Sequence, residues 1–351
     1  MTAPPVDLHF VHPGPVTRRT GGTIYDCRMA DTLRAAGRTV VLHELDGDFP
    51  HCGAATEDAA GRLLAGFPDS ARVVIDGLAL PAFRSSLAEH AGRLRFSALV
   101  HHPLADETGL DAVERGRLFD TERQALRHAC AVIVPSAAMA GRLAEFDVQP
   151  ERLCVVPPGT DPALRAGGGG MDRLSLLCVA SITPRKGHLT LLAALERCRD
   201  LDWQLTCAGP TALDPACLDQ VQAAVALHRL GDRVVFTGPR TGHALEALYD
   251  GADLFVLASA YEGYGMAFAE AMARGLPVVA SGAGAVAETV PEAAGILVPV
   301  GDVGALAAAL RRVMADPAVR RAKADAAWAA GQALPDWPGA ARRFAAVLGL
   351  E

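Results

Sequence analysis

The sequence predicts an α/β protein built from two doubly wound domains. Short apolar, β-branched runs alternate with longer amphipathic segments, and this alternation starts a second time after four glycines at residues 167–170. Strand–helix–strand repetition is typical of parallel sheets that are covered by helices on both faces. The chain has 351 residues, and a single hydrophobic core stops growing below that size, so two domains are expected.

The first domain is predicted over residues 1–165. Its expected strands are residues 8–11, 39–43, 73–75, 98–101, 131–135 and 153–156, with helices over 21–37 and 118–130. These short runs are rich in Val, Ile and Leu, as buried strands are. The glycines at 167–170 are interpreted as part of the connection to the second domain.

The second domain is predicted over residues 172–335. Its expected strands are residues 174–180, 203–208, 234–237, 254–257, 277–280 and 296–298, with helices over 187–198, 267–273 and 303–314. A last helix, residues 338–348, is expected to pack back on the first domain. Ligands of doubly wound sheets bind at the carboxyl ends of the strands, so two facing sheets are expected to form a cleft between the domains.

Composition argues against several classes of partner. The chain carries 33 basic and 40 acidic residues, a net charge of −7, whereas nucleic-acid binding depends on clustered Lys and Arg. No uncharged apolar run reaches the length of a membrane span, and the N-terminus lacks the pattern of a signal peptide. A cytoplasmic protein without an integral membrane segment is therefore expected.

The eight cysteines indicate a reducing environment. They contain no C-x-x-C pair, and several stand inside apolar runs, where a free thiol behaves as a small hydrophobic residue. Their spacing therefore predicts neither a zinc site nor a framework of disulfides.

The most informative motif is residues 259–271, which follow an expected strand and enter an expected helix. Gly263 and Gly265 allow a tight turn and a close approach of the backbone to a ligand. Glu262 stands in the loop and Glu270 lies about one turn into the helix. Two carboxylates here are suited to accept hydrogen bonds from sugar or ribose hydroxyls. The plainer interpretation is a glycine-rich turn with two solvated glutamates.

Two further loops offer groups that bind phosphate. Arg185 and Lys186 stand between a strand and a helix, where a pair of cations can neutralise a diphosphate leaving group. Gly21 and Gly22 follow the first strand and present backbone amides at a helix start. The plainer interpretations are an exposed basic turn and a simple glycine turn.

A third loop carries histidines and carboxylates. His101 and His102 follow a buried strand, and Asp106 and Glu107 come soon after. A histidine at a strand end can bind a donor sugar or an acceptor. The same residue types also suggest a metal, but no third or fourth ligand has suitable spacing. The plainer interpretation is a capped strand end.

These motifs together resemble the family-4 glycosyltransferases of the GT-B fold. The spacing of Glu262 and Glu270, the Arg185-Lys186-Gly187 turn and the segment 275–280 carry the resemblance. It covers nearly the whole chain and is strongest over residues 174–302. It implies two facing Rossmann-like domains and a retaining, nucleotide-sugar-dependent enzyme.

The resemblance also implies roles for single residues. It places donor contacts at Gly22, Arg185, Lys186, Gly263, Tyr264, Gly265, Met266, Glu270 and Gly284. In the family, the position of Glu270 binds the ribose hydroxyls and that of Glu262 faces the donor sugar. Lys186 is expected to contact the diphosphate, and His101 is expected to approach the donor sugar. The expected catalytic residues are therefore His101, Lys186 and Glu262. The acceptor-side candidates are His102, Asp106 and Glu107.

One position departs from the family pattern. The family has Gly-Arg at the end of the first strand of the second domain, and this chain has Ala180-Ser181. A diphosphate-binding arginine is thus missing from its usual place. Arg185 is adjacent, in a different register.

The expected activity is transfer of a sugar from a nucleoside-diphosphate sugar, with UDP or GDP as the nucleotide, to a small soluble acceptor. No D-x-D motif stands at a suitable strand end, so neither a metal nor another cofactor is expected. The alternatives are a sugar-nucleotide epimerase, a phosphorylase with a pyridoxal cofactor, and a binding module without activity. A Rossmann-type oxidoreductase would need G-x-G-x-x-G after its first strand, where this chain has His12-Pro13-Gly14-Pro15.

Overall fold

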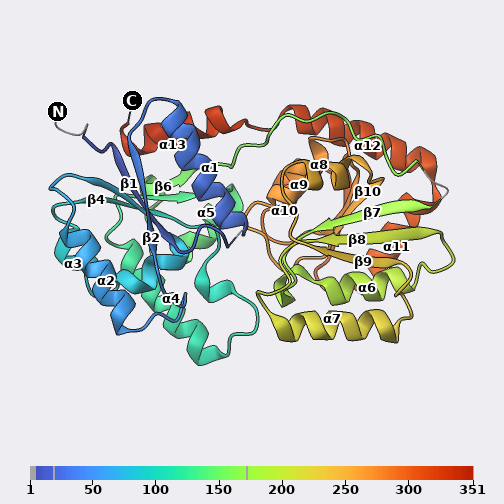
Figure 1. The fold of residues 1–351 in the computed structure, drawn as a ribbon, viewed down its shortest axis with the longest axis horizontal. Helices are drawn as coiled ribbons and strands as arrows, with labels where there is room; N and C mark the ends of the chain where they lie inside the picture. Colours follow the sequence, from blue (N-terminus) through green and yellow to red (C-terminus); the bar gives the residue numbers. More distant parts are fainter. Residues whose placement is uncertain (1–4, 19, 171–172, 351) are drawn as a thin grey trace. The chain divides into compact units, whose positions relative to one another are not determined.

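The computed structural model describes residues 5–18, 20–170 and 173–350. The chain divides into two compact units, the first formed by Met1–Gly159 with Pro335–Glu351 and the second by Thr160–Leu334. Each unit has a six-stranded sheet with helices on both faces (Figure 1). The predicted architecture of two doubly wound α/β units is confirmed.

The first unit contains a wholly parallel sheet in the order β2-β1-β3-β4-β5-β6. Its strands are β1 (Leu8–Pro13), β2 (Val40–Leu45), β3 (Arg72–Asp76), β4 (Arg95–Leu99), β5 (Ala131–Val134) and β6 (Leu153–Val155). Its helices are α1 (Gly21–Ala35), α2 (Ala54–Ala65), α3 (Leu87–His90), α4 (Ala112–Leu126), α5 (Ala137–Leu143) and α13 (Trp337–Leu348). The β3, β4 and β5 strands are almost entirely buried, which explains their continuous apolar sequences.

Helix α13, at the end of the chain, packs on α1 within the first unit (Figure 1). Phe344 of α13 is fully buried and stacks on Phe10 of β1, with ring centroids 6.1 Å apart. Trp337 meets the edge of Tyr25, and the guanidinium of Arg28 lies 5.0 Å from the Trp337 ring centroid. Aromatic contacts therefore tie this last helix to the first strand and first helix.

The second unit contains a parallel sheet in the order β12-β11-β10-β7-β8-β9. Its strands are β7 (Leu174–Val179), β8 (Trp203–Ala208), β9 (Val234–Gly238), β10 (Leu254–Leu257), β11 (Val278–Ser281) and β12 (Gly295–Val298). Its helices are α6 (His188–Glu196), α7 (Pro215–Leu227), α8 (His243–Asp250), α9 (Met266–Met272), α10 (Val286–Thr289), α11 (Val303–Ala315) and α12 (Pro317–Gln332).

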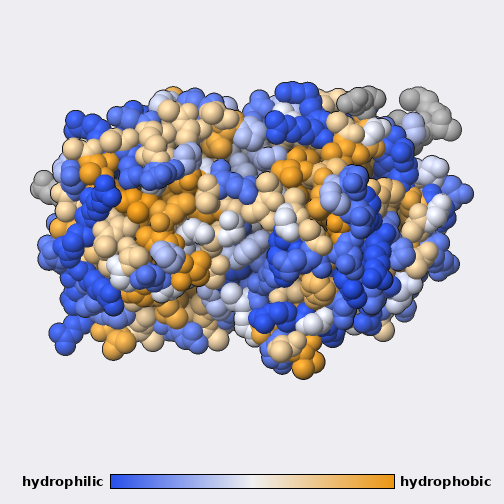
Figure 2. Space-filling model, turned by 180° about the vertical axis from the view of Figure 1, so that it is seen from behind, coloured by the Kyte–Doolittle hydropathy of each residue, from blue (hydrophilic) through white to orange (hydrophobic). Residues whose placement is uncertain are grey.

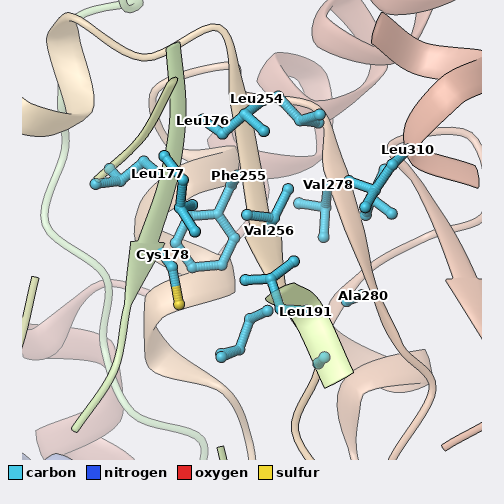
Figure 3. Packing of buried hydrophobic residues seen from close by; sticks show 14 of the residues in the cluster. Leu176, Leu177, Cys178, Leu191, Leu254, Phe255, Val256, Val278, Ala280 and Leu310 are labelled. Carbon is cyan, nitrogen blue, oxygen red and sulfur yellow. The ribbon is translucent and has the colours of Figure 1, made fainter. Parts of the chain in front are cut away.

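The core of this second unit is centred on β7, β10 and β11. Phe255 of β10 pairs with Leu177 of β7 on one side and with Val278 of β11 on the other (Figure 3). Burying each such side chain contributes roughly 1.5–3 kcal/mol relative to leaving it exposed. The apolar runs in the sequence are therefore the source of this unit's stability.

The chain passes from the first unit to the second between Gly159 and Thr160. The glycines at 167–170 lie in the second unit. Gly167 N donates to Asp250 Oδ1 at 3.0 Å, and Gly168 N donates to the Asp250 carbonyl at 2.9 Å. Gly169 N donates to Asp253 Oδ1 at 3.3 Å, so the amides of residues 167–169 are bound to the end of α8 and the segment that follows it.

The surface is mixed in character. On the face drawn in Figure 2, hydrophilic and hydrophobic residues are interspersed. Among the described residues, no helix is both long enough and apolar enough to cross a membrane.

Each sheet contains a point where the direction of strand addition reverses. In the first unit it lies between β1 and β3, and in the second between β7 and β10. Ligands of open α/β sheets bind beyond the carboxyl ends of the strands at such points. These two positions are therefore where functional side chains are expected in each unit.

Candidate active site

The turn after β7 carries Arg185 and Lys186, in a short 3₁₀ segment, Pro184–Lys186. Gly187 follows with φ +65°, and a Cβ there would lie 2.0 Å from the carbonyl oxygen of Ala258. Only glycine fits this approach. Ala260 N donates to the Arg185 carbonyl at 2.7 Å, so the turn after β7 is joined to the loop after β10.

Lys186 and Glu262 form an ion pair at this switch point. Lys186 Nζ lies 2.6 Å from Glu262 Oε1, and Ser259 Oγ donates to the same oxygen at 2.5 Å. The Glu262 side chain is 8% exposed, so Glu262 is not a solvated glutamate on a glycine-rich turn. Burial works to raise the pKa of Glu262, but the charges of Lys186 and Arg185 outweigh it and lower the pKa. The carboxylate is therefore ionised when the lysine is charged.

Gly284 packs closely against the backbone of the loop that contains Glu262. It has φ +58°, and a Cβ there would lie 2.3 Å from the Glu262 carbonyl oxygen. Ala285 N donates to that same oxygen at 2.9 Å. Thr289 Oγ1 donates to the Tyr264 carbonyl at 2.6 Å. The glycine at position 284 thus allows the loop after β11 to hydrogen-bond to the backbone of the loop that contains Glu262.

Glu270 lies on α9, the helix that begins at Met266. Gly265 precedes it with φ +92°, a conformation that favours glycine. Tyr249 Oη donates to Glu270 Oε2 at 2.7 Å, which orients the carboxylate. The guanidinium of Arg274 lies 4.6 Å from the Tyr249 ring centroid and holds that ring in turn.

In the first unit, His101 lies at the other switch point, two residues beyond β4. His101 Nε2 lies 2.8 Å from Asp26 Oδ1 and 3.3 Å from Asp76 Oδ2. The second Asp26 oxygen lies 2.6 Å from His12 Nδ1. Asp26, Asp76 and His12 are buried, and the His101 side chain is 18% exposed. The network therefore reaches solvent through His101.

The carboxylates favour the protonated form of His101. Burial works to lower the pKa of His101, but the charge and hydrogen bonds of Asp26 and Asp76 raise it to about 10. Burial likewise works to raise the pKa of Asp26, yet His101 and His12 lower it. The pair is accordingly an imidazolium held by a carboxylate at neutral pH.

Gly22 lies directly against His101. A Cβ at Gly22 would stand 3.0 Å from His101 Cδ2, tighter than an ordinary contact. The Tyr25 ring meets the His101 ring edge-on at 5.0 Å between centroids, and Tyr25 Oη donates to the Val156 carbonyl at 3.0 Å. The start of α1 and the strand-end histidine are thus brought together.

The acceptor-side candidates differ in how they are held. His102 Nε2 lies 3.7 Å from Glu107 Oε2. Asp106 receives both Nε and Nη2 of Arg142, at 2.8 and 2.7 Å, and this pairing raises the pKa of Arg142. Asp106 therefore fixes the loop to α5, and its oxygens are already occupied by a bidentate pair.

Sequence reasoning missed the residues that orient these groups: His12, Asp26, Asp76, Tyr249 and Ser259. Asp76 closes a buried strand at its carboxyl end, a signal that could have been used. Ser259 stands at the start of the motif after β10 but was given no role, and His12, Asp26 and Tyr249 stand in unremarkable helical or strand patterns. Their contacts depend on which strands are neighbours, and spacing along the chain does not show that.

Two clusters among the described residues bring three metal-binding atoms within 4.8 Å of one another. The first is His12, Asp26 and Asp76, whose atoms already take part in the hydrogen bonds around His101. The second is Cys178, His188 and Cys207, in the core of the second unit.

Two sequence families match this chain. Residues 173–316 match the family described as "Glycosyl transferases group 1". Residues 73–164 match the family described as "Glycosyltransferase Family 4". The matched segments fall in the second and first units respectively and contain Lys186, Glu262, Glu270 and His101.

Curated relatives agree with these matches. An MMP alpha-(1->4)-mannosyltransferase of Mycolicibacterium hassiacum is 32% identical over 277 residues, 74% of this chain and 65% of that protein. A D-inositol 3-phosphate glycosyltransferase of Salinispora tropica is 33% identical over 229 residues, 57% of this chain and 47% of that protein. The matches thus span about half to two thirds of the length of these relatives.

Solved structures share the fold along the whole chain. A sucrose-phosphate synthase from Thermosynechococcus elongatus has a TM-score of 0.83 at 24% identity, covering 99% of each chain. Anabaena HepE in complex with UDP-glucose has a TM-score of 0.80 at 18% identity, covering 98% of this chain and 99% of that one. By its sequence matches and its two Rossmann-like units, this chain belongs to the family-4 glycosyltransferases of the GT-B fold.

Proposed function

We propose that this chain transfers a sugar from a nucleoside-diphosphate sugar to a small acceptor, with retention of the anomeric configuration. The observation that carries the proposal is the Lys186–Glu262 pair at the switch point between β7 and β10. It sets a cation suited to a diphosphate beside a carboxylate suited to sugar hydroxyls. Family membership and the UDP-glucose complex of Anabaena HepE support the same ligand class.

Each group has a defined task in this proposal. Lys186 and Arg185 stabilise the negative charge that builds on the departing nucleoside diphosphate. Glu262 accepts hydrogen bonds from the donor sugar. Glu270, oriented by Tyr249, accepts them from the ribose. No step in this scheme requires a metal or another cofactor.

In the first unit, His101 acts as a cationic hydrogen-bond donor toward the reacting sugar. Asp26 fixes its ring and keeps it protonated, which makes it unsuited to act as a general base at neutral pH. His102 and Glu107 contribute to acceptor binding, while Asp106 positions their loop through Arg142. UDP or GDP is the proposed nucleotide.

The test is thermal unfolding with UDP, GDP, ADP, CDP and dTDP. A ligand at about a hundred times its dissociation constant stabilises a protein by roughly 2.7 kcal/mol. For domains of this size that raises the midpoint by several degrees, on the order of 2–4 °C per kcal/mol. We expect a shift with one base, lost in Glu270→Ala and kept in Glu292→Ala, an exposed glutamate of the same unit.

A shift with none of the nucleotides would contradict the proposal and favour a binding module for another ligand. Turnover of the donor without an acceptor would favour an epimerase. Once a donor is known, the anomeric configuration of the product, read by nuclear magnetic resonance, tests retention directly. An inverted product would overturn that part of the proposal.

A further inference from the structure

Three soft donor side chains meet in the core of the second unit. The pairing of β7 with β8 sets Cys178 directly opposite Cys207. His188 is the first residue of α6, and its Nε2 lies 3.8 Å from Cys178 Sγ. The three side chains are buried, with residue exposures of 0%, 4% and 3% for Cys178, Cys207 and His188. Figure 3 shows Cys178 among the buried residues of the apolar cluster that also contains Leu191.

The spacing of the three donor atoms matches what a bound metal ion requires. Zinc bonds are about 2.3 Å to sulfur and about 2.0–2.1 Å to nitrogen, so tetrahedral geometry separates two sulfurs by about 3.8 Å and sulfur from nitrogen by about 3.6 Å. The observed S–N distance is 3.8 Å, and all three atoms lie within 4.8 Å of one another. Little movement is needed to place one ion between them.

The unsatisfied hydrogen-bonding capacity of His188 also favours a bound metal ion. His188 Nδ1 is buried and has no hydrogen-bond partner among the described residues. Its other nitrogen faces a thiol, which is a weak partner. A buried imidazole that is so poorly satisfied costs free energy. Coordination through Nε2 would supply the strong interaction that this side chain lacks.

We propose that Cys178, Cys207 and His188 form a binding site for one thiophilic metal ion, of the class of Zn²⁺, Cd²⁺ or Cu⁺. Thiolate and imidazole ligands select such ions over Mg²⁺ or Ca²⁺. Loading with a divalent ion forms two metal–sulfur bonds and one metal–nitrogen bond and releases to the buffer whichever protons the two thiols carry. Two thiolates then neutralise the ion, which suits an apolar core.

The site lies next to the turn that carries Lys186. His188 is separated from Lys186 only by Gly187, so a metal bond to His188 would tie the start of α6 to β7 and β8. Occupancy should therefore restrict the turn and change nucleotide affinity. This coupling rests on the proposed function, whereas metal binding itself does not.

The primary test measures metal binding without nucleotide. Reduced, metal-free protein is titrated with Cd²⁺ in a chelator buffer, which suppresses binding to single thiols. We expect one Cd²⁺ per chain, a thiolate-to-metal charge-transfer absorption in the ultraviolet, and proton release detected by calorimetry in buffers of different ionisation enthalpy. Parallel titrations with Zn²⁺ and Cu⁺ then identify which ion of the class binds most tightly.

Variants assign the site. Cys207→Ser and His188→Gln should each weaken Cd²⁺ binding at least a hundredfold. Cys198→Ser is the matched control, because Cys198 is fully buried in the same unit and its Sγ contacts the Ala307 carbonyl instead. It should bind like wild type. A cooperative thermal unfolding transition shows that each variant is folded. Because there are two independent variants, the test still works if one of them does not fold.

Equal Cd²⁺ affinity in Cys207→Ser and Cys198→Ser would overturn the site, as would wild-type protein that binds no Cd²⁺ even when refolded with it. A disulfide between Cys178 and Cys207 that forms in air and cannot be prevented by Cd²⁺ would also overturn it, since the pair would then be a redox couple. If Cd²⁺ binds but no nucleotide does, the metal site stands and the proposed transferase function fails.

Discussion

The imidazole of His101 is held by Asp26 and Asp76, while His12 holds the other oxygen of Asp26. Asp26 is fully buried, so its charge acts through a medium that screens weakly. The ring is thereby fixed in position and in charge. The position and charge of His101 thus depend on residues that do not themselves reach solvent.

Asp26→Asn should change the pH dependence of the reaction. The raised pKa of His101, about 10, keeps it protonated through neutral pH, and loss of the Asp26 charge lowers that pKa. We expect the alkaline limb of the kcat/KM profile to move to lower pH, with reduced activity at pH 8. Asp31→Asn, an exposed aspartate on the same helix, is the control. An unmoved alkaline limb in a folded Asp26→Asn protein would contradict the role assigned to His101.

Lys186→Ala should lower kcat more than it raises KM. Removal of one preorganised group that stabilises developing charge costs about 10²–10³ in kcat. It also leaves Glu262 buried without its lysine, so the unfolding midpoint should fall. Turnover is therefore measured well below that midpoint.

Lys323→Ala is the matched control for Lys186→Ala. Lys186 and Lys323 are the only two lysines in the chain. Lys323 Nζ donates to the carbonyls of Glu292 and Gly295, away from the Glu262 loop. Lys323→Ala should keep wild-type kcat. Wild-type kcat in Lys186→Ala would show that the ion pair is structural.

At the scale of elements, α13 stabilises the unit that holds His101. Phe344→Ala removes a fully buried ring that stacks on Phe10, and such truncations cost about 3–5 kcal/mol. Urea unfolding measures the loss, followed by the fluorescence of Trp337 at the start of α13 in a protein whose other two tryptophans, Trp203 and Trp328, are replaced by phenylalanine. Arg343→Ala, an exposed neighbour on the same helix, should unfold like wild type. Equal stability of the two variants would mean that α13 is only loosely attached.

The strands and helices also show which features could be predicted from the sequence and which could not. The runs of apolar residues gave the expected strands, and Lys186 and Glu262 were found because each follows one of them. Their ion pair depends on β7 and β10 being neighbours, although β8 and β9 come between them in the chain. Cys178 and Cys207 are likewise brought together by strand pairing. Spacing rules for metal ligands describe local loops, so they do not detect ligands on separate strands.

The network around His101 could not be predicted from the sequence for the same reason. His12, Asp26 and Asp76 come from β1, α1 and the end of β3. Each is a single polar residue in an otherwise ordinary segment, and only the sheet order places them around one imidazole. Polar residues that are buried for function carry no periodic signal, whereas apolar core positions do.

At the scale of the whole molecule, buried titratable groups set how stability varies with pH. Glu122 of α4 is fully buried, and burial raises its pKa to about 8 despite a hydrogen bond from Ala105 N to Oε2. The folded protein therefore keeps a proton that the unfolded chain loses above its ordinary pKa of 4.5. The free energy of unfolding must then fall as pH rises from about 4.5 to 8, by at most about 1.4 kcal/mol per pH unit.

Glu122→Gln should remove this dependence, because glutamine is neutral in both states and can still accept from Ala105 N. We expect the variant to match wild type near pH 5 and to exceed its unfolding midpoint at pH 8. Asp120→Asn, an exposed change on the same helix, should leave the wild-type slope intact. His101 adds a separate decline that survives in Glu122→Gln: its raised pKa contributes stability that is complete below pH 6.5 and is lost as pH rises through about 10. Of these two groups, Glu122 alone contributes below pH 6.5 and His101 alone above pH 8, so thermal unfolding from pH 5 to 10 distinguishes them. Identical slopes for Glu122→Gln and wild type between pH 5 and 6.5 would show that Glu122 is ionised in the folded protein.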